Sequence, residues 1–294
     1  MVIKAIKGDV QARVIIALLA VYISWGSTYL AIRIALKDFE PLFMMGIRFL
    51  AVGTGLFLFL RARGASMPDR PQWLNSLLIG GLMFVGGGGG VAVAEQWIES
   101  GLTSLIIATT PLWTVLFAGI WKRRPTRVEM TGLAVGLVGI AVLNYENNMR
   151  ANPLGVAVLL LSSMSWAFGS AWSQRLSLPT GLMSGAVLMI SGGALSMIAS
   201  LIAGENMGGT PSWESLGAML YLAVFGSLIG FSAYNYLLGK VRPALATSYA
   251  YVNPVIAVIL GVLFAGERIT WIGITAMLII LTSVALVILG QKEK

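Results

Sequence analysis

The sequence predicts an all-α integral membrane protein whose ten transmembrane helices form two inverted five-helix repeats. Three observations lead to this prediction: an apolar composition, ten hydrophobic spans, and an echo between the two halves of the chain. Of the 294 residues, 57% are hydrophobic and 11% are charged. Soluble domains carry about 25% charged residues, so the excess apolar surface of this chain must face lipid. A soluble enzyme, a disordered chain and a nucleic-acid-binding domain are therefore disfavoured.

The hydrophobic spans follow one another with short, proline-marked breaks between them. A helix needs about 20 apolar residues to cross the bilayer core. The first span is too long for a cleaved signal peptide, and no small-residue cleavage site follows it. The ten expected helices cover residues 14–36, 41–60, 74–98, 102–121, 128–144, 154–175, 182–203, 215–238, 243–265 and 270–289.

The distribution of lysine and arginine predicts that both termini lie in the cytoplasm. With the N-terminus placed there, 15 of the 20 basic residues fall in cytoplasmic segments and four on the opposite side. Such an excess is typical of cytoplasmic loops. It accounts for the net charge of +8 without a nucleic-acid partner.

The chemistry of a catalytic or metal site is missing from the sequence. The chain contains no cysteine and no histidine, which removes thiol nucleophiles, the commonest metal ligand and the commonest general base. Metalloprotease, hydrolase and phosphate-loop motifs do not occur. We therefore expect no enzyme activity, no catalytic residue, no metal and no cofactor.

The two halves of the chain echo each other at a nearly constant offset, which predicts a five-helix duplication over residues 1–146 and 147–294. Because five is odd, the second copy starts on the opposite side of the membrane. Inverted repeats of this kind are the hallmark of secondary transporters, whose substrate site lies near the midplane. The echoes are Ser24-Trp25 with Ser165-Trp166 at offset 141, Gly86 to Gly90 with Gly226 and Gly230 at 140, and Pro111 with Pro254 at 143.

The echoing residues reach one common depth, which identifies candidates for substrate binding. At about 1.5 Å per residue they lie roughly 14–18 Å from the span ends, near the centre of a core about 30 Å thick. Ordinary packing is the alternative for the tryptophans, and a bridge between helices is the alternative for Asn253. The candidate substrate-binding residues are Trp25, Trp166, Tyr22, Ser27, Thr109, Thr110, Ser163, Tyr234, Tyr249 and Asn253.

Glycines and prolines inside the spans are candidate hinges. A mid-helix proline removes a backbone hydrogen bond, so the carbonyls of Ile107 and Ala250 become open to a substrate amine or a water. Close helix packing is the alternative role for the glycines. The candidate hinge residues are Gly86, Gly88, Gly90, Pro111, Gly226, Gly230 and Pro254.

Arg48 lies inside the second span. An arginine at this depth either extends toward the interface, ties helices together, or meets an anionic group.

Several short motifs resemble the drug/metabolite transporter superfamily, and specifically its ten-helix EamA-type exporters. The resemblance covers residues 12 to 290. It is carried by Ser24-Trp25-Gly26-Ser27, Pro41 with Arg48-Phe49, the stretch ending in Pro111, Ser165-Trp166-Ala167-Phe168-Gly169, Pro243-Ala244 leading to Asn253-Pro254, and Gly266-Glu267-Arg268.

The resemblance implies a multi-pass protein of the bacterial inner membrane that exports small metabolites by alternating access. Within the family the chain is most similar to the YddG-type amino-acid exporters, which favour aromatic amino acids. The expected partners are the lipid bilayer and a small-molecule substrate, with no nucleic acid, and the expected functional unit is a monomer. An exporter of drugs or other metabolites is the first alternative, and a membrane enzyme or a scaffold without transport activity is the second.

Overall fold

A computed structural model describes residues 2–118, 120, 126–145, 152–206, 209–241, 249–266, 268 and 270–290. Every regular element in these ranges is a helix. Pro243, Ala244 and Glu267, which carry part of the resemblance, and the start of the ninth expected span lie outside the described residues.

The helices of the first half form five rods. Some rods contain more than one helical segment, because a π-helix or a break interrupts them. The elements are α1 (Val2–Ala35), α2 (Pro41–Ala62), α3 (Arg70–Gly80) continued by η1 (Gly81–Gly89) and α4 (Gly90–Ala94), α5 (Ser100–Ile107) with α6 (Thr110–Ala118), and α7 (Arg127–Tyr145).

The second half repeats this order. Each rod coincides with one of the ten expected spans, so the prediction of an all-α fold with ten helical spans is confirmed within the described ranges. The elements are α8 (Pro153–Ser173), α9 (Leu182–Ala203), α10 (Trp213–Tyr221) continued by η3 (Leu222–Phe231) and α11 (Ser232–Lys240), α13 (Tyr249–Phe264), and α14 (Trp271–Gly290).

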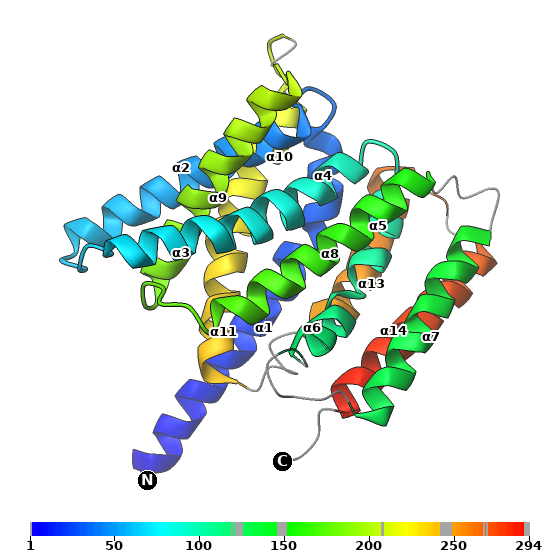
Figure 1. Ribbon diagram of the computed structural model, residues 1–294. Coiled ribbons are helices and arrows are strands. Elements are labelled where there is room, and N and C mark those ends of the chain that lie inside the picture. Colours follow the sequence, from blue (N-terminus) through cyan, green and yellow to red (C-terminus); the bar gives the residue numbers. More distant parts are fainter. Residues whose placement is uncertain are drawn as a thin grey trace.

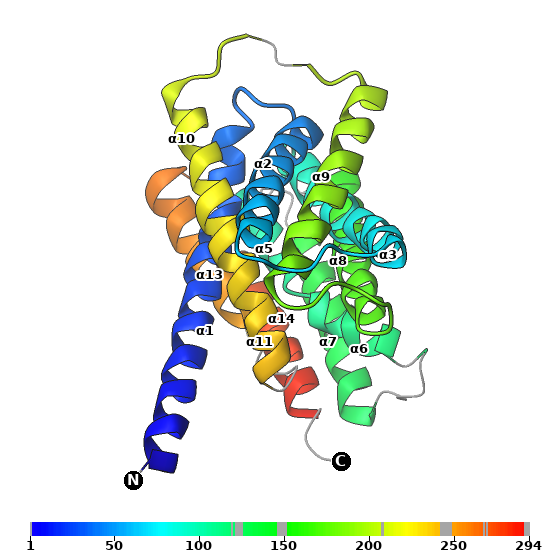
Figure 2. The ribbon, with the colours of Figure 1, turned by 90° about the vertical axis from the view of Figure 1, so that its left-hand side faces the viewer.

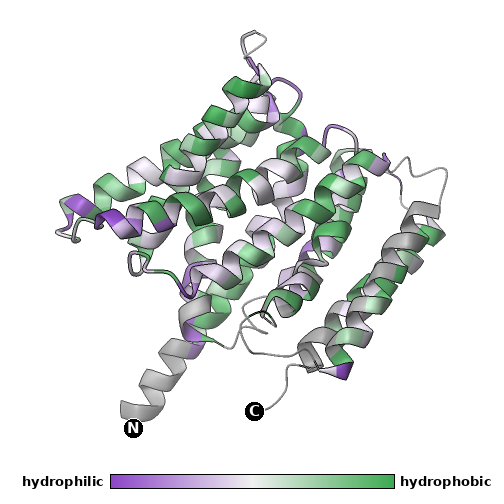
Figure 3. Cartoon of the chain, in the orientation of Figure 1, coloured by the Kyte–Doolittle hydropathy of each residue, from purple (hydrophilic) through white to green (hydrophobic). Residues whose placement is uncertain are grey.

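Six of the described rods are long and apolar enough to cross a membrane by length and composition, and two shorter apolar stretches lie in α13 and α14. Large apolar side chains on their outer surfaces stay exposed, for example Ile202 at 84% and Phe264 at 72%. In Figure 3 hydrophilic residues gather at rod ends and connecting loops, while the rods are mostly apolar. This distribution fits a surface in contact with lipid.

The ends of the helices follow from local sequence. Asp69 accepts from the backbone N–H of Gln72, whose side chain accepts from the N–H of Asp69, so a capping box starts α3. Asn152 caps α8 just before Pro153. Gly204 ends α9 with a φ of 73°, a conformation that glycine adopts at low cost.

A π-helix interrupts the third rod of each half at the same place. The segments η1 and η3 begin 141 residues apart, which is the offset of the sequence echo. The predicted hinge glycines Gly86 and Gly88 lie in η1, Gly226 and Gly230 lie in η3, and Gly90 begins α4. The sequence predicts a weakened helix here, whereas the wider π-helical turn is known only from the structure.

The two halves interlock through closely packed helices. In Figure 1 α1 and α8 run in opposite directions, as inverted repeats require. The second rod of each half packs on its counterpart, because a Cβ at Gly53 in α2 would lie 2.8 Å from the backbone nitrogen of Ile190 in α9. Likewise α7 lies along α14, where a Cβ at Gly139 would lie 2.7 Å from Ile280. Small residues that let backbones approach are typical of membrane helix pairs.

The start of α1 and the end of α14 lie at one end of the molecule in both Figure 1 and Figure 2. That agrees with the expectation that both ends of the chain lie on one side of the membrane.

Candidate functional site

A cavity of about 130 Å³ takes its walls from both halves of the chain. The first half contributes residues of α1, α2, η1, α4 and the α5–α6 break, and the second half contributes residues of α8, η3 and α13. The lining residues are Trp25, Thr28, Tyr29, Ile32, Met45, Arg48, Phe49, Phe84, Gly87, Gly88, Val91, Ile107, Thr110, Ser162, Ser163, Trp166, Gly226, Ser227, Phe231, Tyr249 and Asn253.

Six of the residues expected to bind substrate share this cavity. They come from four helices that are distant in the sequence. They are Trp25, Thr110, Ser163, Trp166, Tyr249 and Asn253, joined by the predicted hinge residues Gly88 and Gly226.

An aromatic cluster forms one part of the cavity wall. The rings of Trp25 and Trp166 meet edge to face with centroids 5.9 Å apart, and Trp25 meets Tyr249 in the same way at 4.9 Å. The indole Nε1 of Trp25 donates to the carbonyl oxygen of Gly226 in η3 over 3.1 Å. This hydrogen bond fixes the ring of the first-half tryptophan on the π-helix of the second half.

Hydroxyl groups form another part of the wall, on α6 and α8. The hydroxyl of Thr110 donates to the carbonyl oxygen of Ile107 over 2.6 Å, so the oxygen that the proline break opens already has one donor. Ser162 donates to Val158 and Ser163 donates to Leu160. Because these hydroxyl protons point back into their own helices, the remaining lone pairs are left to accept hydrogen bonds from a ligand.

Asn253 lies on the cavity wall and also bridges helices. With the amide nitrogen facing them, it donates to the carbonyl oxygens of Tyr249 (3.2 Å) and Tyr22 (3.3 Å). The side chain thereby connects α13 to α1. This is the bridge between helices that was expected from the sequence as the alternative to substrate binding.

Four of the expected binding residues do not line the cavity. Tyr234 packs behind Trp25, with ring centroids 5.0 Å apart. Tyr22 packs against a neighbouring apolar cluster. Ser27 shares a hydrogen bond of 2.6 Å with the hydroxyl of Tyr221, and Thr109 lies behind Ser163, with 3.4 Å between their hydroxyl oxygens.

The glycines divide into two groups by what they face. A Cβ at Gly86 would clash with Ser165 Oγ and one at Gly90 would clash with Ser162 Oγ, so glycine at these two positions lets α8 pack closely. A Cβ at Gly230 would lie 2.6 Å from Nε1 of Trp25, so glycine at this position leaves room for the indole ring. Gly88 is different, because a Cβ there meets nothing nearer than a terminal methyl of Met45 at 3.4 Å.

The two prolines act differently on their helices. Pro111 follows the break between α5 and α6, where Ala108 and Thr109 form a turn. Pro254 lies inside α13, which continues past it as one helix.

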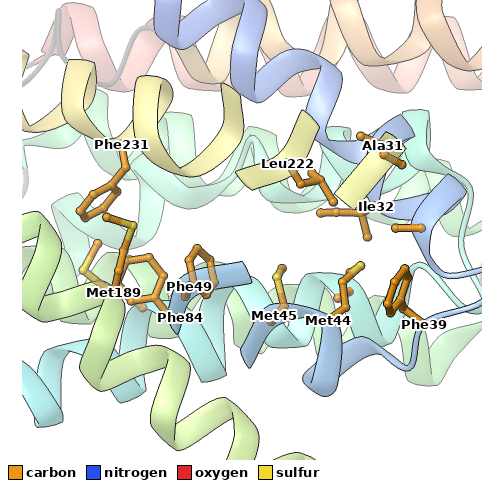
Figure 4. Close-up of a cluster of buried hydrophobic side chains, with 14 of the residues drawn as sticks. Ala31, Ile32, Phe39, Met44, Met45, Phe49, Phe84, Met189, Leu222 and Phe231 are labelled. Atoms are coloured by element: carbon orange, nitrogen blue, oxygen red, sulfur yellow. The ribbon is translucent and has the colours of Figure 1, made fainter. Parts of the chain in front are cut away.

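Several apolar lining residues were not identified from the sequence. These are Ile32, Met45, Phe84 and Phe231. Figure 4 shows them as part of a buried apolar row that extends to Phe39. Beyond Phe39, the carboxylate of Asp38 accepts from the hydroxyl and the N–H of Ser212, and these hydrogen bonds lower the pKa of Asp38 to about 2. Glu205 caps the start of α2 by accepting from the N–H groups of Leu42 and Phe43. Polar contacts between the two halves therefore lie beyond this end of the apolar row.

The EamA-like transporter family model matches residues 12–145 and 153–289. This chain belongs to that family. The "Uncharacterized inner membrane transporter YedA" of Escherichia coli K12 is 47% identical over 276 residues, which cover 94% of this chain and 90% of that protein. The family and this relative support a membrane transporter rather than an enzyme, as the sequence predicts.

More distant relatives cover nearly the whole chain. A protein named "Probable amino-acid metabolite efflux pump" in Escherichia coli K12 is 23% identical over 299 residues, 95% of each chain. A solved crystal structure matches with a TM-score of 0.69 at 20% identity and covers 95% of this chain and 98% of its own. This likeness supports the all-α fold, and the two separate matches of the family model fit a fold built from two repeats.

Proposed function

We propose that this transporter exports amino acids, including aromatic ones, and related small metabolites from the bacterial cytoplasm. The observation that carries the proposal is the cavity wall, where the Trp25, Trp166 and Tyr249 rings adjoin hydroxyl acceptors. Aromatic rings favour an apolar side chain, and hydroxyl lone pairs favour an ammonium group. The similarity to a protein named as an amino-acid metabolite efflux pump supports the same substrate class.

Transport takes place by alternating access, with residues 1–146 and 147–294 rocking as two units about the cavity. Residues from both halves of one chain line the cavity, which supports a monomer as the functional unit. Gly86, Gly88, Gly90 and Pro111 in the first unit, and Gly226, Gly230 and Pro254 in the second, permit the helices to bend during this motion. Tyr22, Ser27, Thr109 and Tyr234 support the lining residues from behind or join the site in another state of the cycle.

Flux measurements in liposomes that contain only this protein test the substrate class. We expect radiolabelled phenylalanine to leave loaded vesicles faster than it leaves protein-free vesicles, with and without an imposed proton gradient. Radiolabelled threonine is measured in the same way, and ethidium serves as the probe for a drug exporter. Flux of ethidium without flux of phenylalanine or threonine would support the drug-exporter alternative, and flux of none of the three would reject the proposal.

The proposal places both termini in the cytoplasm, and single cysteines can test this orientation in a chain without native cysteine. Gly209 precedes α10 and Ser66 lies between α2 and α3, so they lie at opposite ends of the rods. In intact cells an impermeant thiol reagent should label Gly209→Cys and leave Ser66→Cys unlabelled until the membrane is opened. The reverse pattern would invert the orientation, and equal labelling of both would contradict the inverted ten-helix arrangement.

A further inference from the structure

Arg48 is a buried cation in the wall of the cavity. Its side chain is 6% exposed, and it is the one charged residue among the described residues that line the cavity. Its Nε donates to Ser227 Oγ over 2.7 Å, its Nη1 lies 3.7 Å from the sulfur of Met45, and its guanidinium lies 4.8 Å from the ring centre of Phe49. Arg48 therefore ties α2 to η3 and also faces the cavity.

The guanidinium has more hydrogen-bonding capacity than its protein partners use. It carries five N–H donors in a planar fork that matches a carboxylate. Within the part of the chain that the structure describes, no carboxylate pairs with it. Burying a charge without a paired opposite charge is expensive, and ionisable residues inside a membrane mark functional sites by default.

The π-helix η3, in the second half of the protein, leaves room for the planar guanidinium group of Arg48. A Cβ at Gly226 would lie 2.8 Å from Arg48 Nη2 and 2.9 Å from Thr28 Cγ2, so the guanidinium lies directly against the backbone of η3 and a side chain at this position would displace it. The hydroxyl of Ser227, the next residue, holds Nε. The π-helix thus positions both the arginine and, through the carbonyl of Gly226, the indole of Trp25.

We propose that Arg48 binds the carboxylate group of the transported molecule. The cavity then selects carboxylates over neutral amides of the same shape and over organic cations. A zwitterionic amino acid is satisfied at both ends, because the hydroxyl oxygens of Thr110 and Ser163 accept from its ammonium group. This inference rests on the proposed function for the identity of the substrate, but not for the chemistry of the arginine.

Matched ligands that differ only in the anionic group test the proposal. Purified protein in detergent is titrated with 3-phenylpropionate and with 3-phenylpropionamide, and phenylalanine flux in liposomes is challenged with unlabelled phenylalanine and phenylalanine amide. Because a charge-assisted, two-point hydrogen bond is lost with the amide, we expect each acid to bind about 10- to 100-fold more tightly than its amide.

Variants then assign this preference to Arg48. In Arg48→Gln the acid-to-amide ratio should fall to about one, and in Arg48→Lys, which keeps the charge without the fork, it should fall only in part. The ratio is measured within each variant, so a lower yield of folded protein does not affect it. Arg63→Gln is the control, because Arg63 directly follows α2 and also lies beside a phenylalanine ring, at 5.1 Å from the ring centre of Phe59, but is exposed.

The outcomes separate the two proposals. Equal affinity of wild-type protein for acid and amide, or an unchanged ratio in Arg48→Gln, would overturn the arginine site, whatever the flux shows. Tight binding of 3-phenylpropionate with no phenylalanine transport would instead reject the amino-acid proposal and leave the arginine site standing.

Discussion

Replacing Gly88 by leucine is expected to stop most transport while leaving the protein inserted and folded. Gly88 lines the cavity, and a Cβ there meets only the ends of the flexible Met45 and Phe49 side chains, at 3.4 and 3.8 Å. Leucine therefore extends into a space of about 130 Å³. A substrate that binds beside this leucine overpacks the cavity, which costs about 1–3 kcal/mol. Because about 1.4 kcal/mol is a factor of ten in affinity, phenylalanine flux should fall by roughly one to two orders of magnitude.

Two further variants separate the effect of filling the cavity from damage to the helix. Gly88→Ala adds only a carbon that the structure accommodates and should keep most of the flux. Gly55→Leu has open space around its Cβ and should behave as wild type. Wild-type flux in Gly88→Leu, at equal protein per vesicle, would remove this part of the cavity from the pathway.

Replacing Trp166 by alanine is expected to reduce phenylalanine transport more than threonine transport. The indole lies on the cavity wall, edge to face with Trp25 and with Phe84 at 6.2 Å. An aromatic pair contributes about 0.5–1.5 kcal/mol beyond area burial, so apparent affinity for phenylalanine should weaken by about 2- to 13-fold. Threonine has no ring and loses less.

Trp172→Ala is the matched control, because this tryptophan lies on the same helix, packs against Phe168 and does not line the cavity. It should change the two fluxes in equal proportion or not at all. A proportional fall of both substrates in Trp166→Ala would assign Trp166 to the fold or to the conformational change. No fall in either would exclude it from the substrate path.

The rods and the depth of the site follow from the sequence because they depend on local properties. Apolar length fixes the spans, and proline and glycine mark where a helix weakens. The sequence predicts one depth for Trp25 and Trp166 because both lie near the middle of equivalent spans, whereas the edge-to-face contact of their rings is known only from the structure. Whether a glycine such as Gly90 bends the helix or admits α8 depends on which helix lies opposite, which is a long-range property.

The geometry of the α-helix explains why Ser27 and Tyr22, two of the expected binding residues, do not line the cavity. Residues three and four positions apart share a helix face, whereas residues two apart do not. Ser27 is two residues from Trp25 and turns to Tyr221, while Thr28 and Tyr29, at three and four, reach the cavity. Tyr22 shares the face of Trp25 but lies about one turn earlier in α1, where it packs against an apolar cluster that Trp25 also contacts.

The contacts of Arg48 could not be predicted from composition or from its depth in the span. Its position inside the second span was evident, but its partners Ser227 and Gly226 lie about 180 residues away. Only the packing of α2 against η3 shows that the charge faces a cavity. The π-helices are also contacted from distant parts of the chain, for example where Ser165 Oγ donates to the carbonyl oxygen of Leu82 over 2.7 Å.

Cysteine protection tests most directly whether this cavity is the transport site. Ser163→Cys places a thiol on the cavity wall, and Ser66→Cys places one in the exposed loop between α2 and α3. In vesicles of both orientations, a negatively charged methanethiosulfonate reagent should modify Ser163→Cys and block flux, and phenylalanine should slow that reaction. Phenylalanine should not slow the modification of Ser66→Cys. Failure of the reagent to reach Ser163→Cys from either side, or equal protection of both thiols, would contradict a substrate site in this cavity.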